Sequence, residues 1–296
     1  MYVTAADGVR LYVCDEGEGT PVLFLHEFAG DHRSWEPQIA GLRDRYRCIA
    51  FSARGYLPSE VPCGVGSYSY TAHRHDAISV LDALGVERAH IVGLSMGGFT
   101  ALQLGIHRPE RVQSLVVAAT GSGADPAHRA EFHSEAERIA EGFLREGSAA
   151  MARRLGLGPS RVQLKNKNEE CWRQFVQHLG EHSEEGSALT SLGFLRLRPS
   201  LWDIADEISH ISAATLLLNG DEDEACLIPG LFLKRTIAMA ALQIIPRTGH
   251  TLNLEDPDAF NRTIVGFFKT VEAGAWTPRD SRTLGRGQIE DPGGER

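Results

Sequence analysis

The chain has 296 residues, of which 42% are hydrophobic and 23% charged, a composition typical of a globular protein and not of a disordered one. The formal net charge of −9 argues against a general nucleic-acid binder, because contact with phosphates needs a basic surface. No apolar run approaches the roughly 20 residues of a membrane span, so we expect no membrane partner.

Strand and helix patterns alternate over the first 120 residues. Asp7-Gly8 lies between two apolar stretches and predicts a hairpin turn. Runs that are apolar on both faces predict buried strands, and apolar residues at helical spacing predict the helices between them. The predicted strands are 22–25, 48–51, 90–92 and 115–119, and the predicted helices begin near 71 and span 96–107.

The alternation stops at about residue 121. Residues 121–199 show helical patterns and no convincing strand, and strands resume at 215–219 and 242–245. A last helix begins with Asp256 as N-cap and Pro257 in its first turn. We therefore predict a core made of 1–120 and 200–272, a helical insertion at 121–199, and a disordered tail at 273–296.

Strands that alternate with helices predict an α/β fold with a doubly wound, mostly parallel sheet. Active sites of such sheets form at the carboxyl ends of the strands. The five cysteines are scattered without a C-x-x-C pair, which favours neither a disulfide framework nor a zinc site. The first residues lack the features of a signal peptide, so we expect a cytoplasmic protein. We also expect neither a metal nor a cofactor.

A serine motif lies at one of these strand ends. Gly93-Leu94-Ser95-Met96-Gly97 joins the strand 90–92 to the helix that follows. A tight turn of this kind needs small neighbours and lifts the serine hydroxyl above the sheet, at the N-terminus of a helix. The alternative is a flexible glycine-rich turn with an incidental serine. No Lys-Ser/Thr pair follows the glycines, which excludes a P-loop.

A serine nucleophile needs a base and an acid that orients it. Among the histidines after Ser95, only His250 lies just beyond the carboxyl end of a predicted strand. Four carboxylates, at 221–224, follow the preceding strand, and some of them are expected to belong only to a solvated loop. The chain order serine, acid, histidine is that of one class of serine hydrolases.

These motifs resemble those of the α/β-hydrolase superfamily, in the branch with a serine nucleophile and a helical cap after the sixth strand. The resemblance spans residues 9–270 and implies that Ser95 is the nucleophile and His250 the general base. It implies Asp223 as the acid, because the family often shows G-x-x-D and Asp223 follows Gly220 at that spacing. Asp221 lies too close to the strand end to reach the histidine.

The resemblance also implies an oxyanion hole. Its two donors would be the backbone N–H groups of Met96 and of Phe28, because His26-Glu27-Phe28 resembles the family's His-Gly-x turn. Glu27 departs from that pattern, since an ionised carboxylate in this hole would repel the oxyanion. We therefore expect Glu27 to turn away from the hole and pair with Arg54. A Glu27 solvated at the rim of the pocket and a protonated Glu27 that donates to the substrate are the alternatives.

The expected reaction is hydrolysis of a carboxylic ester or lactone through an acyl-enzyme. C–C bond hydrolysis of β-diketone-like compounds, amide hydrolysis, perhydrolysis and a non-catalytic ligand binder stay open as alternatives. A small molecule is the expected partner, and a homodimer is left open. For the substrate pocket we consider His26, Glu27, Trp172 and Phe194, although Trp172 and Phe194 fit the core of the cap equally well.

Overall fold

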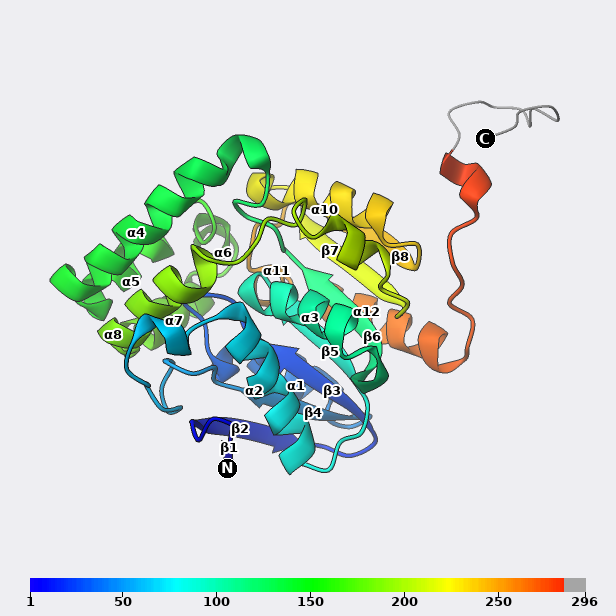
Figure 1. The fold of residues 1–296 in the computed structure, drawn as a ribbon, viewed down its shortest axis with the longest axis horizontal. Coiled ribbons are helices and arrows are strands. Elements are labelled where there is room, and N and C mark those ends of the chain that lie inside the picture. Colours follow the sequence, from blue (N-terminus) through cyan, green and yellow to red (C-terminus); the bar gives the residue numbers. More distant parts are fainter. Residues whose placement is uncertain (285–296) are drawn as a thin grey trace.

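Eight strands form one sheet in the computed structural model, which describes residues 1–284 (Figure 1). Their order is β1-β2-β4-β3-β5-β6-β7-β8. The pairs β1–β2 and β2–β4 are antiparallel, and all the others are parallel. The bounds are β1 Tyr2–Thr4, β2 Arg10–Glu16, β3 Thr20–Leu25, β4 Tyr46–Phe51, β5 Ala89–Leu94, β6 Val112–Ala118, β7 Thr215–Gly220 and β8 Ala240–Ile245.

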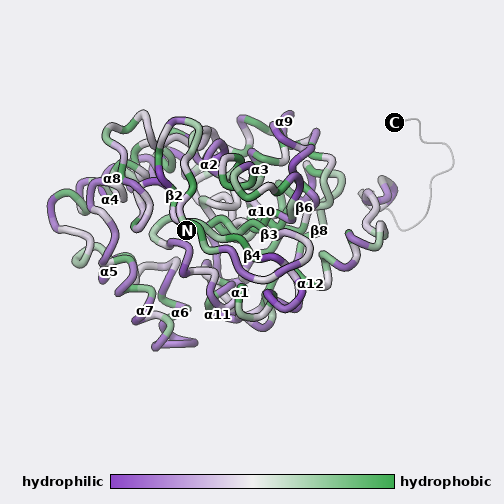
Figure 2. The backbone as a smooth tube through the Cα atoms, turned by 90° about the horizontal axis from the view of Figure 1, so that it is seen from below, coloured by the Kyte–Doolittle hydropathy of each residue, from purple (hydrophilic) through white to green (hydrophobic). Residues whose placement is uncertain are grey.

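Helices cover both faces of this sheet. Successive strand residues enter different apolar clusters: Leu23 of β3 packs with α2 and α3, whereas Phe24 packs with α1 and α12. A strand buried on both faces must be apolar throughout, which explains the continuous hydrophobic runs. Figure 2 shows these hydrophobic stretches along the central strands. The core helices are α1 Glu36–Leu42, α2 Tyr70–Ala83, α3 Met96–His107, α9 Ala205–Ser209, α10 Glu224–Thr236, α11 Leu252–Glu255 and α12 Pro257–Glu272.

A cap of helices lies between β6 and β7 in the chain. In Figure 1 its helices gather at one end of the molecule, beside the sheet. They share an apolar cluster that includes Phe143 and Leu179, and Ala29 and Leu254 of the core join it, so the cap is packed on the core. Its helices are α4 Arg129–Glu146, α5 Ser148–Gly156, α6 Val162–Lys167, α7 Glu169–Gly180 and α8 Glu184–Thr190.

Short helical turns complete the fold. They connect the longer elements, and two of them flank the cap helices. Five are 3₁₀ turns, η1 His32–Trp35, η2 Val65–Ser67, η3 Pro109–Arg111, η4 Pro126–His128 and η6 Ser281–Leu284, and one is a π turn, η5 Ser191–Leu195.

The local predictions near the last helix are confirmed. The Asp256 side chain accepts a hydrogen bond from the Ala259 N–H, and Pro257 is the first residue of α12. The predicted disordered tail falls partly on residues 285–296, which lie outside the described residues. Its first part contacts the core: Trp276 donates a hydrogen bond of 2.8 Å to the Met239 carbonyl, and Arg279 donates one of 2.7 Å to that of Lys234.

Among residues 1–284, no helix has the length and apolar character needed to cross a bilayer.

Candidate active site

Ser95 occupies a strained turn between β5 and α3. Its φ of 55° lies in the left-handed region, which is uncommon for a residue with a side chain and is often found at functional sites. The turn is tight on both sides. A Cβ on Gly97 would lie 2.0 Å from the Leu25 carbonyl oxygen, and one on Gly93 would lie 2.2 Å from the Gly97 oxygen. The backbone therefore requires both glycines of the motif.

His250 and Asp223 meet across the loops that follow β8 and β7. Nδ1 of His250 lies 2.8 Å from Oδ2 of Asp223, and both side chains are buried. Burial opposes ionisation of Asp223, but the charge and hydrogen bond of His250 outweigh it, so the pKa of this carboxyl falls below its ordinary value. An ionised Asp223 holds the imidazole in one orientation. Asp221 is exposed and instead accepts a hydrogen bond from the Thr248 N–H, at 3.1 Å.

Ser95 and His250 line one cavity of about 160 Å³ between the core and the cap. Phe28 and Met96 line it as well. Met96 is the first residue of α3, so its N–H has no acceptor within the helix. Among the described residues no hydrogen bond joins Ser95 Oγ to His250. Such contacts often tighten only when substrate binds.

Glu27 lies behind the turn that carries Phe28, and it does not line this cavity. Its Oε1 accepts a hydrogen bond from Ser34 Oγ at 3.3 Å and lies 4.0 Å from Nη2 of Arg161. Burial raises the pKa of Glu27 above its ordinary value of 4.5, although the charge of Arg161 acts in the opposite direction.

The predicted pairing of Glu27 with Arg54 is wrong. Arg54 is buried and binds the Asp76 carboxylate through two hydrogen bonds of 2.6 and 2.8 Å. It also binds Asp7 at 2.8 Å. The guanidinium binds carboxylates of α2 and of the β1–β2 turn. These contacts hold it away from the turn after β3 that carries Glu27 and Phe28, which we call the oxyanion turn.

The other residues considered for the pocket also lie outside the lining of this cavity. His26 accepts the Ala53 N–H at 3.0 Å and thereby joins the turns that follow β3 and β4. Trp172 donates to the Gly156 carbonyl within the cap. Phe194 is fully buried and packs edge-on against Phe99. All three hold the structure around the cavity instead of facing it.

Two arginines of the cap line the cavity, and neither was predicted, because no sequence pattern distinguishes them from surface arginines. Arg161 donates to the Phe28 carbonyl at 3.2 Å. Arg198 donates to the Ser122 carbonyl and lies over the rings of Phe99 and Phe132, at 5.3 and 5.1 Å. Both side chains are buried, and burial lowers the pKa of each.

A wider hollow of about 580 Å³ adjoins the cavity and shares Ser122, Phe132, Glu135 and Ser160 with it. We call it the mouth. Its remaining lining is strongly acidic and comes from the cap, the loop after β7 and the start of α10. The acidic residues include Asp125, Glu131, Glu222 and Glu224.

One group of side chains has the composition of a metal site. Ligand atoms of Asp223, Cys226 and His250 lie within 4.8 Å of one another. However, Asp223 and His250 already share a hydrogen bond, which a metal ion would have to displace. We therefore derive no chemistry from a metal at this position.

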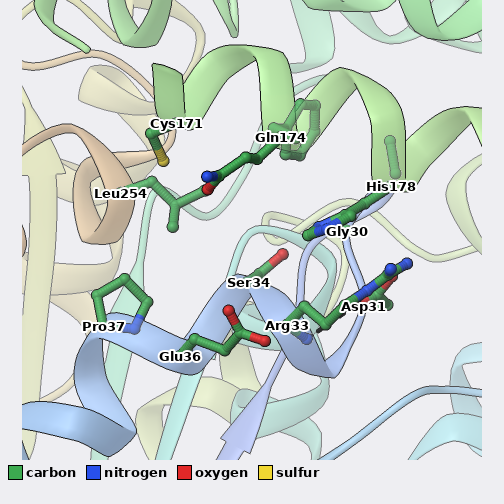
Figure 3. Close-up of a pocket in the computed structure, with 12 residues that line it drawn as sticks. Gly30, Asp31, Arg33, Ser34, Glu36, Pro37, Cys171, Gln174, His178 and Leu254 are labelled. Carbon is green, nitrogen blue, oxygen red and sulfur yellow. Dashed lines mark hydrogen bonds and ion pairs between the residues drawn. The ribbon is translucent and has the colours of Figure 1, made fainter. Parts of the chain in front are cut away.

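A separate hollow of about 80 Å³ lies between α7 and the η1–α1 segment (Figure 3). Cys171, Gln174 and His178 of α7 line one side of it, opposite Ser34 and Pro37. Neither Ser95 nor His250 borders it, so it marks a contact between cap and core and not the reaction site.

A family model described as the alpha/beta hydrolase fold matches residues 20–257. The chain belongs to the α/β-hydrolase family. The predicted fold class, a mostly parallel sheet with helices, is thereby confirmed.

Several characterised proteins are similar to this α/β hydrolase over most of their length. The 3-oxoadipate enol-lactonase 1 of Acinetobacter baylyi is 28% identical over 275 residues, which cover 92% of this chain and 98% of that protein. The 2-hydroxy-6-oxo-6-phenylhexa-2,4-dienoate hydrolase of Comamonas testosteroni is 30% identical, with 86% and 90% covered. The structure of a thermophilic esterase from Thermogutta terrifontis superposes with a TM-score of 0.81 at 27% identity, with 92% and 98% covered.

Proposed function

We propose that this α/β hydrolase cleaves a carboxylic ester or lactone of a small molecule with Ser95, His250 and Asp223 as a catalytic triad. The observation that carries the proposal is the position of His250: it is oriented by Asp223 at 2.8 Å and lines the same cavity as Ser95. A nucleophile, a base and an acid in this arrangement are sufficient for acyl transfer.

The reaction proceeds in two halves. Ser95 Oγ attacks the substrate carbonyl while His250 Nε2 takes the hydroxyl proton, and Asp223 stabilises the imidazolium that forms. The backbone N–H groups of Met96 and Phe28 bind the oxyanion. The alkoxide leaves with the proton from His250, and a water molecule, deprotonated by the same imidazole, then hydrolyses the acyl-enzyme to release the acid and free Ser95.

The relatives support cleavage of an ester bond and also explain why a second reaction must be tested. An enol-lactonase and an esterase are among the similar proteins, and both are named for ester-type bonds. The similar dienoate hydrolase keeps C–C bond cleavage as the alternative reaction on the same triad. Amide hydrolysis and perhydrolysis would use the same nucleophile, whereas a non-catalytic ligand binder would not use Ser95 as a nucleophile.

A substrate panel separates these functions. Turnover of short-chain 4-nitrophenyl esters, lactones and vinylogous diketones is measured with wild type and with Ser95→Ala. Circular dichroism checks that the variant is folded. We expect turnover of esters or lactones and none with the variant. Preferential turnover of the diketones would contradict the ester assignment and favour C–C bond hydrolysis. No turnover of any compound would favour the ligand binder.

Covalent labelling tests the nucleophile independently of the substrate. A fluorophosphonate probe should modify wild type at one site, and peptide mapping should place the adduct on Ser95. Labelling that persists in Ser95→Ala would contradict the assignment.

The cytoplasmic location stays a prediction, and the homodimer stays open.

A further inference from the structure

Arg198 is a buried cation without an acidic partner. It follows η5 in the cap, its side chain is 4% exposed, and within residues 1–284 no carboxylate lies at ion-pair distance from it. Burial lowers the pKa of Arg198, and the charge of another cation, Arg129, lowers it further. A buried charge that lacks a counter-charge is strongly unfavourable, so this arrangement needs an explanation.

The contacts within the protein satisfy only part of the guanidinium. One terminal nitrogen donates to the Ser122 carbonyl, and the plane lies near the rings of Phe99 and Phe132. Nε of Arg198 is buried and has no acceptor among the described residues. These contacts hold the side chain in place on the wall of the catalytic cavity and leave its charge uncompensated.

Arg161, the other arginine of the cavity, has a different environment. Its guanidinium lies 4.0 Å from the Glu27 carboxyl and donates to the Phe28 carbonyl at 3.2 Å. It is therefore partly occupied by the oxyanion turn. Nε of Arg161, like that of Arg198, has no acceptor among the described residues. However, only Arg161 has a carboxyl within ion-pair distance, so Arg198 is the arginine of the cavity that lacks a counter-charge in residues 1–284.

We propose that Arg198 binds a free carboxylate of the substrate, and that the enzyme acts on esters or lactones whose acyl part carries this second carboxylate. The proposal rests on the function proposed above. Arginine presents paired donors that match a carboxylate, and a buried pair of this kind gives strong selectivity.

The position of the charges assigns the carboxylate to the acyl part. Arg198 lies over Phe99, which is one helical turn after Ser95 and donates its N–H to the Ser95 carbonyl. The mouth is lined by Glu131, Glu222 and other carboxylates, which would repel an anion on the leaving group, whereas Glu135 is the one carboxylate in the lining of the cavity and lies at its border with the mouth. The cavity of about 160 Å³ resembles in size one of about 150 Å³ that holds benzene, so a short acyl chain fits it.

Two esters of matched length test the proposal. Mono-4-nitrophenyl glutarate and 4-nitrophenyl pentanoate have the same leaving group and differ at the far end of the acyl chain, where one has a carboxylate and the other a methyl group. We expect wild type to prefer the glutarate ester. Arg198→Gln should lower the ratio of the two kcat/KM values by about 10- to 100-fold, the range for a hydrogen bond to a charged group. Arg198→Lys should restore part of the ratio.

The matched control is Arg196→Gln. Arg196 lies two residues away on the same turn and pairs with Glu137 on the cap surface, so its loss changes the net charge equally. This variant should keep the wild-type ratio. An equal loss for both esters in Arg198→Gln, or an unchanged ratio, would overturn the proposal and assign Arg198 a structural role.

A binding measurement keeps the two proposals apart. Calorimetry with Ser95→Ala and glutarate does not require catalysis, and binding should weaken at least tenfold in Ser95→Ala/Arg198→Gln. Arg198-dependent binding without turnover of either ester would support the carboxylate site and contradict the ester hydrolase. Turnover of the pentanoate ester without glutarate binding or glutarate preference would support the hydrolase and overturn the carboxylate site.

Discussion

The Asp223 carboxylate lies 2.8 Å from Nδ1 of His250, across the gap between the loops that follow β7 and β8. Both side chains are buried, so water does not compete for this hydrogen bond. Because Nδ1 of His250 is bonded to Asp223, Nε2 is the imidazole nitrogen that can accept the proton of Ser95.

Asp223→Asn should therefore lower kcat by about 10⁴-fold, because an amide favours the wrong tautomer of the histidine. Asp221→Asn is the matched control. Its carboxylate is exposed and binds only the Thr248 N–H, so we expect less than a tenfold loss. Steady-state kinetics on one ester measures both variants. Severe loss in Asp221→Asn and mild loss in Asp223→Asn would contradict the assignment of the acid.

Glu27→Gln tests the buried carboxyl behind the oxyanion turn. The folded protein raises the pKa of Glu27 above 4.5, so the folded state binds the proton more tightly than the unfolded state. The free energy of unfolding should consequently decrease as the pH rises from 4.5 towards the folded pKa, and this decrease should be smaller in Glu27→Gln. Urea unfolding at several pH values measures the difference.

The exposed Glu36 provides the control for this experiment, because Glu36→Gln should keep the wild-type pH dependence. Since Glu27 does not line the cavity, Glu27→Gln should keep kcat within about tenfold of wild type. Parallel stability curves for wild type and Glu27→Gln would refute the effect of burial. A loss in kcat above a hundredfold, with a pKa missing from the pH–rate profile, would identify Glu27 as a catalytic acid.

Asp31→Asn should destabilise the contact between core and cap. The buried Asp31 carboxylate binds His182 of the cap at 3.0 Å and Arg33 at 2.7 Å. Breaking a buried pair on one side costs about 3–5 kcal/mol, so we expect a loss of this size in the free energy of unfolding at pH 7. Glu181→Gln removes only the exposed partner of Arg33 and should cost less than about 1 kcal/mol. Equal losses in the two variants would contradict the importance of the buried link.

The same pair predicts a dependence on pH. Burial opposes ionisation of Asp31, but the hydrogen bonds and charges of His182 and Arg33 outweigh it and hold the pKa of Asp31 below its ordinary value of 3.8. The stabilisation is therefore present above pH 3.8 and lost as the pH falls below it. Wild type should lose more stability than Asp31→Asn on acidification, and curves that run in parallel would speak against it.

The acidic mouth should slow the entry of anionic substrates. Glu131→Gln/Glu222→Gln removes two exposed carboxylates from its lining. At an ionic strength of about 0.01 M, where screening is weak, kcat/KM for mono-4-nitrophenyl glutarate should rise about two- to fivefold. The rise should disappear at about 0.5 M salt and should not occur with the pentanoate ester. A rise that persists at high salt would point to a change in shape instead of charge.

Much of the fold follows from local sequence signals. The central strands β3 to β7 are buried on both faces and are therefore almost continuously apolar. The Ser95 turn can be recognised because close backbone contacts require both of its glycines. Asp223 and His250 could be considered because each follows a predicted strand of the sheet. Their sequence positions alone place them at the same edge of a parallel sheet.

The charged interior could not be predicted in the same way. Arg161 and Arg198 come from cap segments whose packing on the core is decided by tertiary contacts, and neither has a neighbour in sequence that distinguishes it from a surface arginine. The partner of Arg54 was missed for a related reason. Asp76 lies on α2, more than 20 residues away, and no short-range pattern links the two.

The cap separates two strands that lie side by side in the sheet. Leu115 of β6 pairs with Thr215 of β7, so about 100 residues must be synthesised before β6 acquires its second neighbour. At roughly 5–20 residues per second, translation leaves that edge open for about 5–20 s. An apolar strand with an open edge is prone to pair with other chains. The yield of folded protein should therefore depend on how well the nascent chain is protected while the cap is being made.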